Sequence, residues 1–597
     1  MRQFINENAR GISLHFLNGV LVLCSLGALA LLVFETGWPL GPEARHQVRL
    51  ATQAVLFVFV AQEIVRLGLQ RRRLAHLKTR APEAALVVLI FAEAIFGGRL
   101  HAWMRGVLPD VPAGTLTLFL LACSQLTLLA LIAVRALRRN RLLAALRLSP
   151  GMLFILSFAL LIVCGTLMLK TPNATTRGIG WLDAFFTATS SVCVTGLGVI
   201  DVSSDLTQHG QWIILGLIQI GGLGVMTLTY FFAYFLAGGV SLRNRITLQN
   251  LFNEDSLGQI GTALGVIIGF TLAVELAGAA GIHSVLAGSG MSPPGGAVFF
   301  SLFHSVSAFC NAGVSTLPGN LADPVMRGQT GVLAIIMALV VTGGIGFPVA
   351  RNFWHVFVAR MQRLAGLRAA IPQRLSTNSR VVLVTTGVLL AGGAALLYLT
   401  EFVLGNGRAG AGLSPWFTAL FQSVTARSAG FGITPSGLLT PGASILMMAL
   451  MFVGGSPSST AGGVKTSTLA VAVLALRRVV LGRPEIEAFG RRIPNETADR
   501  ALAVVLLALA FFVLVATALC MLHPELPAFD LVFEALGAVS TAGLARGVTG
   551  ELGAAARLVM IAGMFIGRVG VLMFILSFIP RQERAGYRYP EATIIIT

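Results

Sequence analysis

The fold is decided by four short glycine-containing stretches: Cys193-Val194-Thr195-Gly196-Leu197-Gly198, Cys310-Asn311-Ala312-Gly313-Val314, Arg427-Ser428-Ala429-Gly430-Phe431-Gly432 and Ser540-Thr541-Ala542-Gly543-Leu544. In each stretch a glycine follows a small residue and precedes an apolar one. The four glycines are separated by 117, 117 and 113 residues. Such even spacing indicates four internal repeats.

The sequence around each glycine predicts the same order of elements. A long apolar helix comes first, over residues 151–169, 259–283, 380–404 and 499–522. A short amphipathic stretch, which we call a half-helix, then covers Trp181–Cys193, Gly295–Cys310, Pro415–Arg427 and Ala528–Ser540. A second apolar helix comes last, over residues 210–237, 329–357, 443–480 and 555–579. The half-helices are shorter than the ~20 residues that a helix needs to cross a bilayer, so each is expected to end inside the membrane.

The composition is typical of a membrane protein. Of the 597 residues, 55% are hydrophobic and 11% are charged, whereas a soluble domain has about 25% charged residues. The mean hydropathy of +0.82 also argues against a soluble enzyme and against a disordered chain. Further apolar segments precede the repeats, near residues 14–34, 48–69, 83–97 and 113–137. We predict an all-α polytopic membrane protein with an N-terminal four-helix extension (1–150) and a repeat domain (151–597), its repeats at about 151–240, 258–360, 380–480 and 499–580.

The charges predict the orientation in the membrane. The net charge is +18, which in a soluble protein would suggest a nucleic acid partner. Here the basic residues lie between apolar segments, as expected for cytoplasmic connectors. The N-terminus is then cytoplasmic, and the half-helices enter the membrane from outside. The six cysteines are scattered without metal-ligand spacing, so free thiols are expected.

The glycine stretches predict an ion filter. Irregular backbone at membrane depth is tolerated only where protein or water covers it. Four such segments around one axis can line a pore whose carbonyl oxygens replace the hydration shell of a cation, while the half-helices point their negative ends at it. Close helix packing explains any single glycine equally well, but four in register favour a filter. The predicted ion-binding residues are Val194, Thr195, Gly196, Asn311, Ala312, Gly313, Ser428, Ala429, Gly430, Thr541, Ala542 and Gly543.

The stretch 151–597 resembles the Trk/Ktr/HKT superfamily of potassium transporters, in particular the KtrB/TrkH-type pore-forming subunit. The motifs that carry the resemblance are Val192-Cys193-Val194-Thr195-Gly196-Leu197, Ser307-Ala308-Phe309-Cys310-Asn311-Ala312-Gly313, Ala426-Arg427-Ser428-Ala429-Gly430-Phe431, the loop Gly454–Thr466 and the tail Tyr587-Arg588-Tyr589-Pro590-Glu591. The fourth segment matches more loosely, and the first 150 residues lie outside the minimal family pattern.

This resemblance implies potassium uptake across the inner membrane by a homodimer, with one pore in each chain and K⁺ bound at the filter carbonyls. It also implies a separate cytosolic KtrA/TrkA-type regulatory ring that binds nucleotide, and no cofactor in this chain. Within the family, serine in the first filter segment goes with sodium transport and glycine in all four goes with potassium. The four glycines here therefore favour potassium, with sodium or mixed transport as the alternative.

A second site is predicted where Gly454–Thr466 interrupts an otherwise apolar helix with four glycines, a proline and five Ser or Thr residues. A lipid-facing helix of this composition is not stable, so the break is expected inside the protein, below the filter. An unwound kink without a function is one explanation, whereas the resemblance implies a movable gate loop. The predicted gate residues are Gly454, Gly455, Ser456, Gly462, Gly463, Lys465 and Arg568.

Arg568 lies near the middle of the last predicted span, about 11 residues from either end. That is about 16 Å at 1.5 Å per residue, too far for the side chain to reach water, so it is expected to face a cavity or a partner. The resemblance places it beside the gate loop as an electrostatic barrier. Lys465 has a similar role or extends to the cytoplasm. Arg427 and Glu534 either form an ion pair that braces the filter or have separate roles.

Two other functions are weaker predictions. An intramembrane protease is the remote enzyme alternative, because Gly454-Gly455-Ser456 resembles a nucleophile site. A serine nucleophile needs a positioned base, and no spacing pairs His15, His304 or His355 with it. The N-terminal extension vaguely resembles a voltage sensor, but its arginines cluster at the cytoplasmic end of a span, which favours a structural or assembly role.

Overall fold

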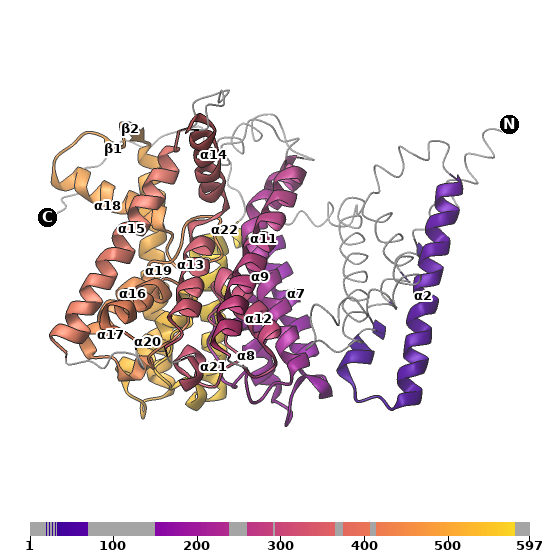
Figure 1. The fold of residues 1–597 in the computed structure, drawn as a ribbon. Helices are drawn as coiled ribbons and strands as arrows, with labels where there is room; N and C mark the ends of the chain where they lie inside the picture. Colours follow the sequence, from indigo (N-terminus) through magenta and orange to yellow (C-terminus); the bar gives the residue numbers. More distant parts are fainter. Residues whose placement is uncertain are drawn as a thin grey trace, which may run out of the picture.

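The computed structural model describes residues 33–69, 150–237, 260–290, 293–326, 328–364, 374–405 and 413–579, with a few positions between 19 and 31. Within these residues the protein is mostly helical (Figure 1). A short antiparallel hairpin of β1 (Ile486–Ala488) and β2 (Arg491–Ile493) lies at the same end of the molecule as helix α14 (Phe347–Leu364).

The four repeats share one order of elements: a long helix, a half-helix, a glycine segment and a second helix. Repeat one contains α7 (Pro150–Leu169), α8 (Trp181–Val192) and α9 (Gln208–Ala237). Repeat two contains α11 (Ile260–Ser289), α12 (Ala297–Phe309), α13 (Thr330–Ile345) and α14. Repeat three contains α15 (Thr377–Leu397), the π-helical turn η5 (Tyr398–Val403), α16 (Pro415–Ala426), α17 (Pro441–Phe452) and α18 (Thr466–Val480). Repeat four contains α19 (Asn495–Leu522), α20 (Ala528–Val539), α21 (Ala554–Val569) and α22 (Val571–Phe578). Single 3-10 turns lie in the connections, at Pro172–Ala174, Asn320–Ala322, Pro324–Met326, Ser436–Leu438 and Thr549–Glu551.

The half-helices α8, α12, α16 and α20 agree with the predicted bounds to within two residues. Local sequence explains where they begin. In α16, the Ser414 hydroxyl accepts a hydrogen bond from the Phe417 amide at 3.3 Å, and Pro415 occupies the first helical position, where its missing N–H costs nothing. α12 begins after Gly296, whose φ is 91°.

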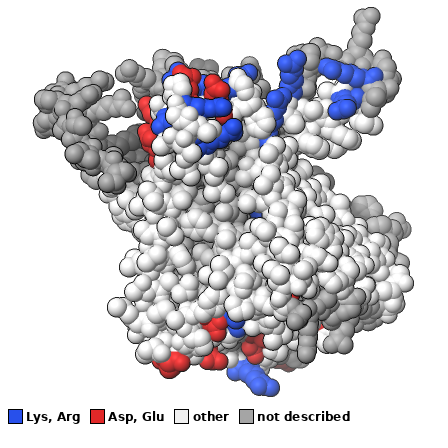
Figure 2. Space-filling view, turned by 90° about the vertical axis from the view of Figure 1, so that its left-hand side faces the viewer, with Lys and Arg blue, Asp and Glu red and all other residues white. Residues whose placement is uncertain are grey.

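The long helices have the length and polarity of membrane spans. Within the described residues, four helices are long and apolar enough to cross a membrane: Gly151–Leu169, Gly265–Ser289, Thr377–Val403 and Asn495–Leu522. Two bent pairs, α13 with α14 and α21 with α22, would bring this number to six if each pair is one span. Figure 2 shows an almost uncharged band between two charged ends of the molecule. This distribution is the one that a bilayer requires.

The bent pairs correct the prediction of continuous second helices over 329–357 and 555–579. The chain turns by 103° between α13 and α14 and by 88° between α21 and α22. Each break falls at a glycine with positive φ, Gly346 at 84° and Gly570 at 89°. Pro348, which cannot donate a backbone hydrogen bond, follows the first of these breaks. Apolar residues follow both glycines directly, at Phe347 and at Val571–Phe578, so the sequence pattern alone did not reveal the bends.

The half-helices form the buried centre, and the long helices surround it. Most of the largest fully buried side chains lie in the half-helices: Phe186, Phe300, Phe303, Phe309, Phe421 and Phe533. The long helices, in contrast, also carry apolar residues that are more than half exposed, for example Leu160, Val388 and Leu506. Lipid is the solvent that suits such an outer surface.

The described part of the N-terminal extension includes α2 (Pro42–Leu69), which matches the span predicted near 48–69. It lies to one side of the helices of the repeats in Figure 1. The Asn173 side-chain amide donates a hydrogen bond to the Thr36 carbonyl at 3.0 Å and so links repeat one to the segment before α2. The spans predicted near 83–97 and 113–137, most of the span near 14–34, and the tail Tyr587–Glu591 lie outside the described residues.

Candidate functional site: a ring of four glycine segments

Each glycine segment leaves the C-terminal end of its half-helix through a tight turn. In repeats one, two and four, the residue before the glycine donates its amide hydrogen to a carbonyl five residues back: Thr195 to Ser190 at 2.8 Å, Ala312 to Ser307 at 2.8 Å and Ala542 to Gly537 at 2.9 Å. This pattern satisfies carbonyls that the helix end would otherwise leave free. The segments are thereby held in one geometry relative to their half-helices.

The backbone of all four segments alternates in handedness. Positive φ values occur at the residue two positions before each glycine: Val194 (53°), Asn311 (60°), Ser428 (71°) and Thr541 (48°). Positive φ values also occur at Gly196 (89°), Gly313 (66°), Gly430 (77°) and Gly543 (73°). A β-branched residue such as Val194 or Thr541 rarely adopts this conformation. Strained backbone of this kind clusters at functional sites.

The four segments contact one another in order and close into a ring. A Cβ atom added to each glycine would lie at most 3.0 Å from a carbonyl oxygen of another segment: Gly196 against Ala312, Gly313 against Ala429, Gly430 against Ala542, and Gly543 against Thr195. The first segment therefore meets the second, and the fourth returns to the first. A side chain at any of the four positions would have to displace a backbone carbonyl.

The loop between α17 and α18 lies against this ring. The sequence predicts a break at Gly454–Thr466, and the helices end and restart there. The loop is closed at its base, because the Gly454 amide donates to the Val464 carbonyl at 3.0 Å and the Val464 amide donates to the Phe452 carbonyl at 3.1 Å. At its tip, the Ser456 amide donates to the Gly344 carbonyl at 2.9 Å, at the end of α13.

Side-chain hydrogen bonds join the loop to the second and third filter segments. The Asn311 side-chain amide donates to the Thr460 hydroxyl at 2.7 Å, and that hydroxyl donates to the Phe309 carbonyl at 2.9 Å. The Gly462 amide donates to the Ser428 hydroxyl at 2.8 Å. Asn311 and Ser428 each lie two residues before the glycine of their segment. The loop therefore packs against one end of the ring.

The predicted gate residue Arg568 is buried beside the loop. Its guanidinium Nη1 donates to the Thr460 carbonyl at 2.7 Å, and its side chain is 7% exposed. The expected position in the middle of a continuous span is wrong, because Arg568 lies in the last turn of α21, two residues before the bend at Gly570. Lys465 does not extend into water; its Nζ donates to the Ala461 carbonyl of the same loop at 2.7 Å.

Of the two alternatives for Arg427 and Glu534, an ion pair or separate roles, the structure shows separate roles, because the two side chains have different partners. Arg427 Nη2 donates to the Gly454 carbonyl at 2.9 Å and so ties the third segment to the gate loop. Glu534 accepts hydrogen bonds from the Thr549 hydroxyl at 2.6 Å and from the Arg546 amide at 3.1 Å. The sequence places both charges on or next to a half-helix, but it does not determine their hydrogen-bond partners.

Ser456 has no arrangement that suits a nucleophile. Its hydroxyl donates to the Ile345 backbone carbonyl. His304, one of the histidines considered as a base, bonds instead to the Phe300 carbonyl and to the Ser315 hydroxyl, both at 2.9 Å. The geometry thus gives the protease alternative no support.

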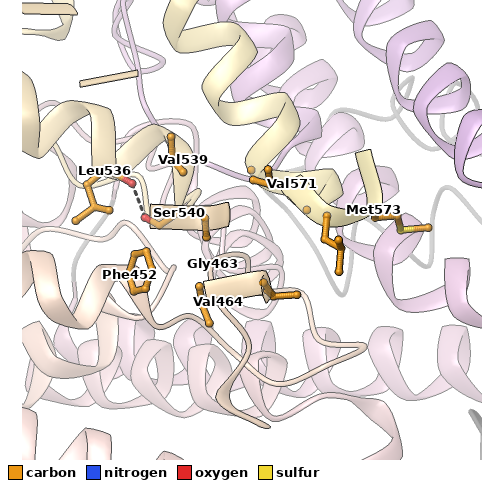
Figure 3. Close-up of a pocket in the computed structure, with 13 residues that line it drawn as sticks. Phe452, Gly463, Val464, Leu536, Val539, Ser540, Val571 and Met573 are labelled. Atoms are coloured by element: carbon orange, nitrogen blue, oxygen red, sulfur yellow. Dashed lines mark hydrogen bonds between the residues drawn. The ribbon is translucent and has the colours of Figure 1, made fainter. Parts of the chain in front are cut away.

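Two cavities adjoin the ring and the loop. One, of about 130 Å³, lies at the glycine end of the ring, and its lining includes Gly196, Gly313 and Asn320. The other, of about 240 Å³, is apolar and lies behind the loop (Figure 3). In Figure 3, Gly463 and Val464 of the loop face this cavity from one side and Val571 and Met573 of α22 from the other.

Two residues with filter contacts were not singled out from the sequence, Thr460 and Asn320. The Asn320 side-chain amide donates to the Gly313 carbonyl at 2.8 Å. The sequence does contain a signal for Asn320, because Gly-Asn is a typical pair in left-handed backbone. The pair Gly319-Asn320 follows soon after the second filter segment. Nothing in the sequence marks Thr460 beyond its place in the loop.

Comparisons with known proteins agree with this architecture. The family model of the TrkH cation transport proteins matches residues 152–586. The Ktr system potassium uptake protein B of Bacillus subtilis (strain 168) is 33% identical over 466 residues, which are 77% of this chain and 99% of that protein. The potassium/sodium uptake protein NtpJ of Enterococcus hirae is 33% identical over 462 residues, 75% of this chain and 98% of that protein.

A solved structure shares the fold. The crystal structure of the potassium transporter TrkH from Vibrio parahaemolyticus superposes with a TM-score of 0.57 at 18% identity, covering 83% of this chain and 97% of that chain. The proteins matched in all these comparisons are transporters rather than enzymes. Family model, relatives and fold together show that this chain is a membrane transporter that belongs to the TrkH family of cation transport proteins.

Proposed function

We propose that this protein takes up potassium ions through the ring of four glycine segments, with the loop between α17 and α18 as its gate. The observation that carries the proposal is the closed ring, in which each glycine lies against a carbonyl of a neighbouring segment. Such a ring offers backbone oxygens in place of the hydration shell of a cation. The half-helices add the negative ends of their dipoles from four directions.

Potassium is the proposed ion, and sodium is the second candidate. Glycine at all four filter positions supports potassium through the family resemblance, as does the name of the Bacillus relative. The name of the Enterococcus relative includes sodium as well as potassium. The two candidates differ in the ion bound at the ring, and the rates at which the wild-type protein carries K⁺ and Na⁺ distinguish them.

The gate proposal rests on the position of the loop and of two cations. The loop is hydrogen-bonded to the second and third filter segments, and Arg568 and Lys465 both donate to its carbonyls. Positive charge at Arg568 and Lys465 beside the pathway opposes a cation that leaves the ring. Movement of the loop would relieve the obstruction without altering the filter.

We further propose the assembly that the resemblance implies. The protein functions as a homodimer in the inner membrane with its N-terminus in the cytoplasm, and a separate cytosolic ring of the KtrA/TrkA type regulates it by binding nucleotide. No cofactor is proposed for this chain. The excess of basic residues in connectors such as 477–492 supports the cytoplasmic assignment of that end.

The test of the filter is Gly196→Ser. A side chain there would collide with the Ala312 carbonyl and would strain a backbone with φ of 89°, which costs about 1–2 kcal/mol for an L-residue. We expect loss of the preference for K⁺ over Na⁺, or loss of conduction, in flux measurements on protein in liposomes.

Gly216→Ser is the matched control, because Gly216 lies in α9 of the same repeat with open space around its Cα. The control should keep wild-type flux and ion preference. If Gly196→Ser also keeps both, in protein of normal yield, the first filter segment is misassigned. A wild-type protein that carries Na⁺ as fast as K⁺ would instead favour mixed transport.

A further inference from the structure

The loop after the second filter segment returns to the ring and places an amide on it. Gly319 and Asn320 both have left-handed backbone, with φ values of 73° and 63°. Asparagine is among the few residues with a side chain that tolerate this conformation. Two successive left-handed residues turn the chain sharply, and the Asn320 side chain thereby lies over the glycine end of the ring.

The contacts of Asn320 fix the orientation of its amide. Its Oδ1 accepts a hydrogen bond from the Leu321 backbone amide at 2.8 Å, so this atom must be the oxygen. Its Nδ2 donates to the Gly313 carbonyl at 2.8 Å and lies 3.5 Å from the Gly430 carbonyl. One NH₂ group thus spans two filter carbonyls that belong to adjacent repeats.

This amide breaks the fourfold symmetry of the ring. Asn320 lies seven residues after Gly313, and the equivalent positions in the other repeats are Ser203, Gly437 and Gly550. Ser203 donates instead to Asp201 in its own loop, at 2.7 Å. The two glycine positions have no side chain. Repeat two alone places a side-chain amide at this position.

The amide also borders the entrance to the ring. The cavity of about 130 Å³ at the glycine end is lined by Gly196, Gly313 and Asn320, and by Asp201 and Ser315 at its sides. A cation that enters by this route meets the Gly313 and Gly430 carbonyls while one amide holds both. The separation of these two oxygens, and their freedom to turn, depend on that amide.

We propose that Asn320 is a positioning residue that sets the ion preference of the outer filter by holding the Gly313 and Gly430 carbonyls at a fixed separation. The inference deepens the proposed function and rests on it. Ion preference of a carbonyl ring depends on the number, spacing and rigidity of its oxygens. A donor shared by two oxygens restricts both spacing and rigidity, and it acts without touching the ion.

The test uses two variants of the full-length protein. Asn320→Gly removes the amide but keeps a residue that tolerates positive φ, so the loop backbone is preserved. Asn320→Asp keeps the shape and the bond to the Leu321 amide, but replaces the donor by an acceptor that repels both carbonyls. The measured quantities are the initial rates and half-saturation concentrations for K⁺ and Na⁺ in liposomes.

We expect Asn320→Gly to lower the ratio of K⁺ to Na⁺ transport by about fivefold, the change that corresponds to one hydrogen bond. Asn320→Asp should lower the ratio as well, while its negative charge decreases the half-saturation concentration for both ions, more strongly at low ionic strength. Asp323→Asn is the control: it lies in the same loop, and its carboxylate accepts a hydrogen bond from the Val325 amide. This control should keep the wild-type ratio.

A folded Asn320→Gly protein, judged by thermal melting and gel filtration, that keeps the wild-type ratio would overturn the inference. An equal loss of rate for both ions would do so too, because that is the effect of a purely structural residue. If Asn320→Gly does not fold, an unchanged ratio in Asn320→Asp is the overturning result. Failure of the proposed function is distinguishable, because Gly196→Ser would then also leave the ratio unchanged.

Discussion

At the scale of single residues, Thr460 connects the filter to Arg568. Its hydroxyl bonds to Asn311 of the second filter segment, and its carbonyl accepts from Arg568. A change at Arg568 therefore acts on the loop as well as on a passing ion. Two further guanidinium nitrogens of Arg568, Nε and Nη2, have no hydrogen-bond partner among the described residues, so most of its charge is not neutralised by direct contacts.

Arg568→Gln should increase flux. The substitution removes the charge, whose repulsion of a cation about 6 Å away is about 3 kcal/mol at an effective dielectric constant of ~20. Arg568→Lys keeps the charge without the planar fork and should stay nearer to wild type. The measurement is flux per molecule in liposomes, with the amount of folded protein determined by gel filtration.

Arg568→Gln and Arg568→Lys distinguish a barrier from a structural support. If Arg568 only stabilises the loop, its substitution by a shorter residue leaves the Thr460 carbonyl without its hydrogen-bond donor. Less folded protein would then result. Loss of folded protein without a gain in flux per molecule contradicts the barrier role. Equal gains from Arg568→Gln and Arg568→Lys would assign the effect to the hydrogen bond with Thr460 rather than to charge.

The sequence could not predict the side-chain hydrogen bonds between different repeats of the site. Asn311 and Thr460 are separated by 149 residues, and their pairing depends on how two repeats pack. The glycine positions could be predicted, because glycine best tolerates a positive φ together with the close approach of a neighbouring carbonyl. The sequence could not decide whether Arg427 and Glu534 form an ion pair, and it did not single out Thr460, for the same reason: side-chain partners depend on packing across repeats.

At the scale of elements, the boundaries of helices and loops were predicted correctly where the residue composition changes along the chain. They were missed where it does not change. Half-helix ends were predicted closely, since glycine, proline and serine mark them. The loop between α17 and α18 was predicted from its run of small and polar residues. The bends at Gly346 and Gly570 were missed, because apolar residues directly flank both glycines and one glycine in an apolar helix is common in membranes.

Deletion of Ser456–Gly462 should raise flux. The remaining ends already meet, because the Gly454 amide bonds to the Val464 carbonyl at 3.0 Å, so the shortened loop can close without stretching the helices. The deletion removes the hydrogen bonds that Thr460 and the Gly462 amide make with the filter segments, and it leaves the residues of the ring in place. Flux of K⁺ into liposomes checks this prediction.

The matched control for the deletion is Pro457→Ala, which keeps the length of the loop and changes an exposed residue. It should behave as wild type. Unchanged flux in the deletion variant, with normal gel filtration, would mean that the loop does not obstruct the pathway. A change in the ratio of K⁺ to Na⁺ would show that the loop supports the filter instead of gating it.

At the scale of the whole molecule, the ring, the gate loop and both bends lie within residues 150–579. The long helices surround the half-helices, and the half-helices surround the ring, so each layer is buried by the next. The described part of the N-terminal extension meets this assembly through a hydrogen bond between Asn173 and the Thr36 carbonyl. The contact lies in a connection between helices, away from the ring residues.

A protein that begins at Pro150 should therefore keep the ratio of K⁺ to Na⁺ transport, because the four ring segments and the gate loop all belong to the repeats after that residue. The check is ion flux in liposomes at several imposed membrane potentials. The same measurement tests the voltage-sensor alternative. If the extension is a sensor, the flux of the full-length protein should depend more steeply on potential than that of the truncated protein. Asn173→Ala in the full chain removes the hydrogen bond to Thr36 alone and should match wild type. If the truncated protein folds but has an altered ratio of K⁺ to Na⁺ transport, the extension contributes to the ion preference of the pore, and this prediction is wrong. If the truncated protein loses a voltage dependence that the full-length protein has, the extension senses voltage rather than supporting assembly.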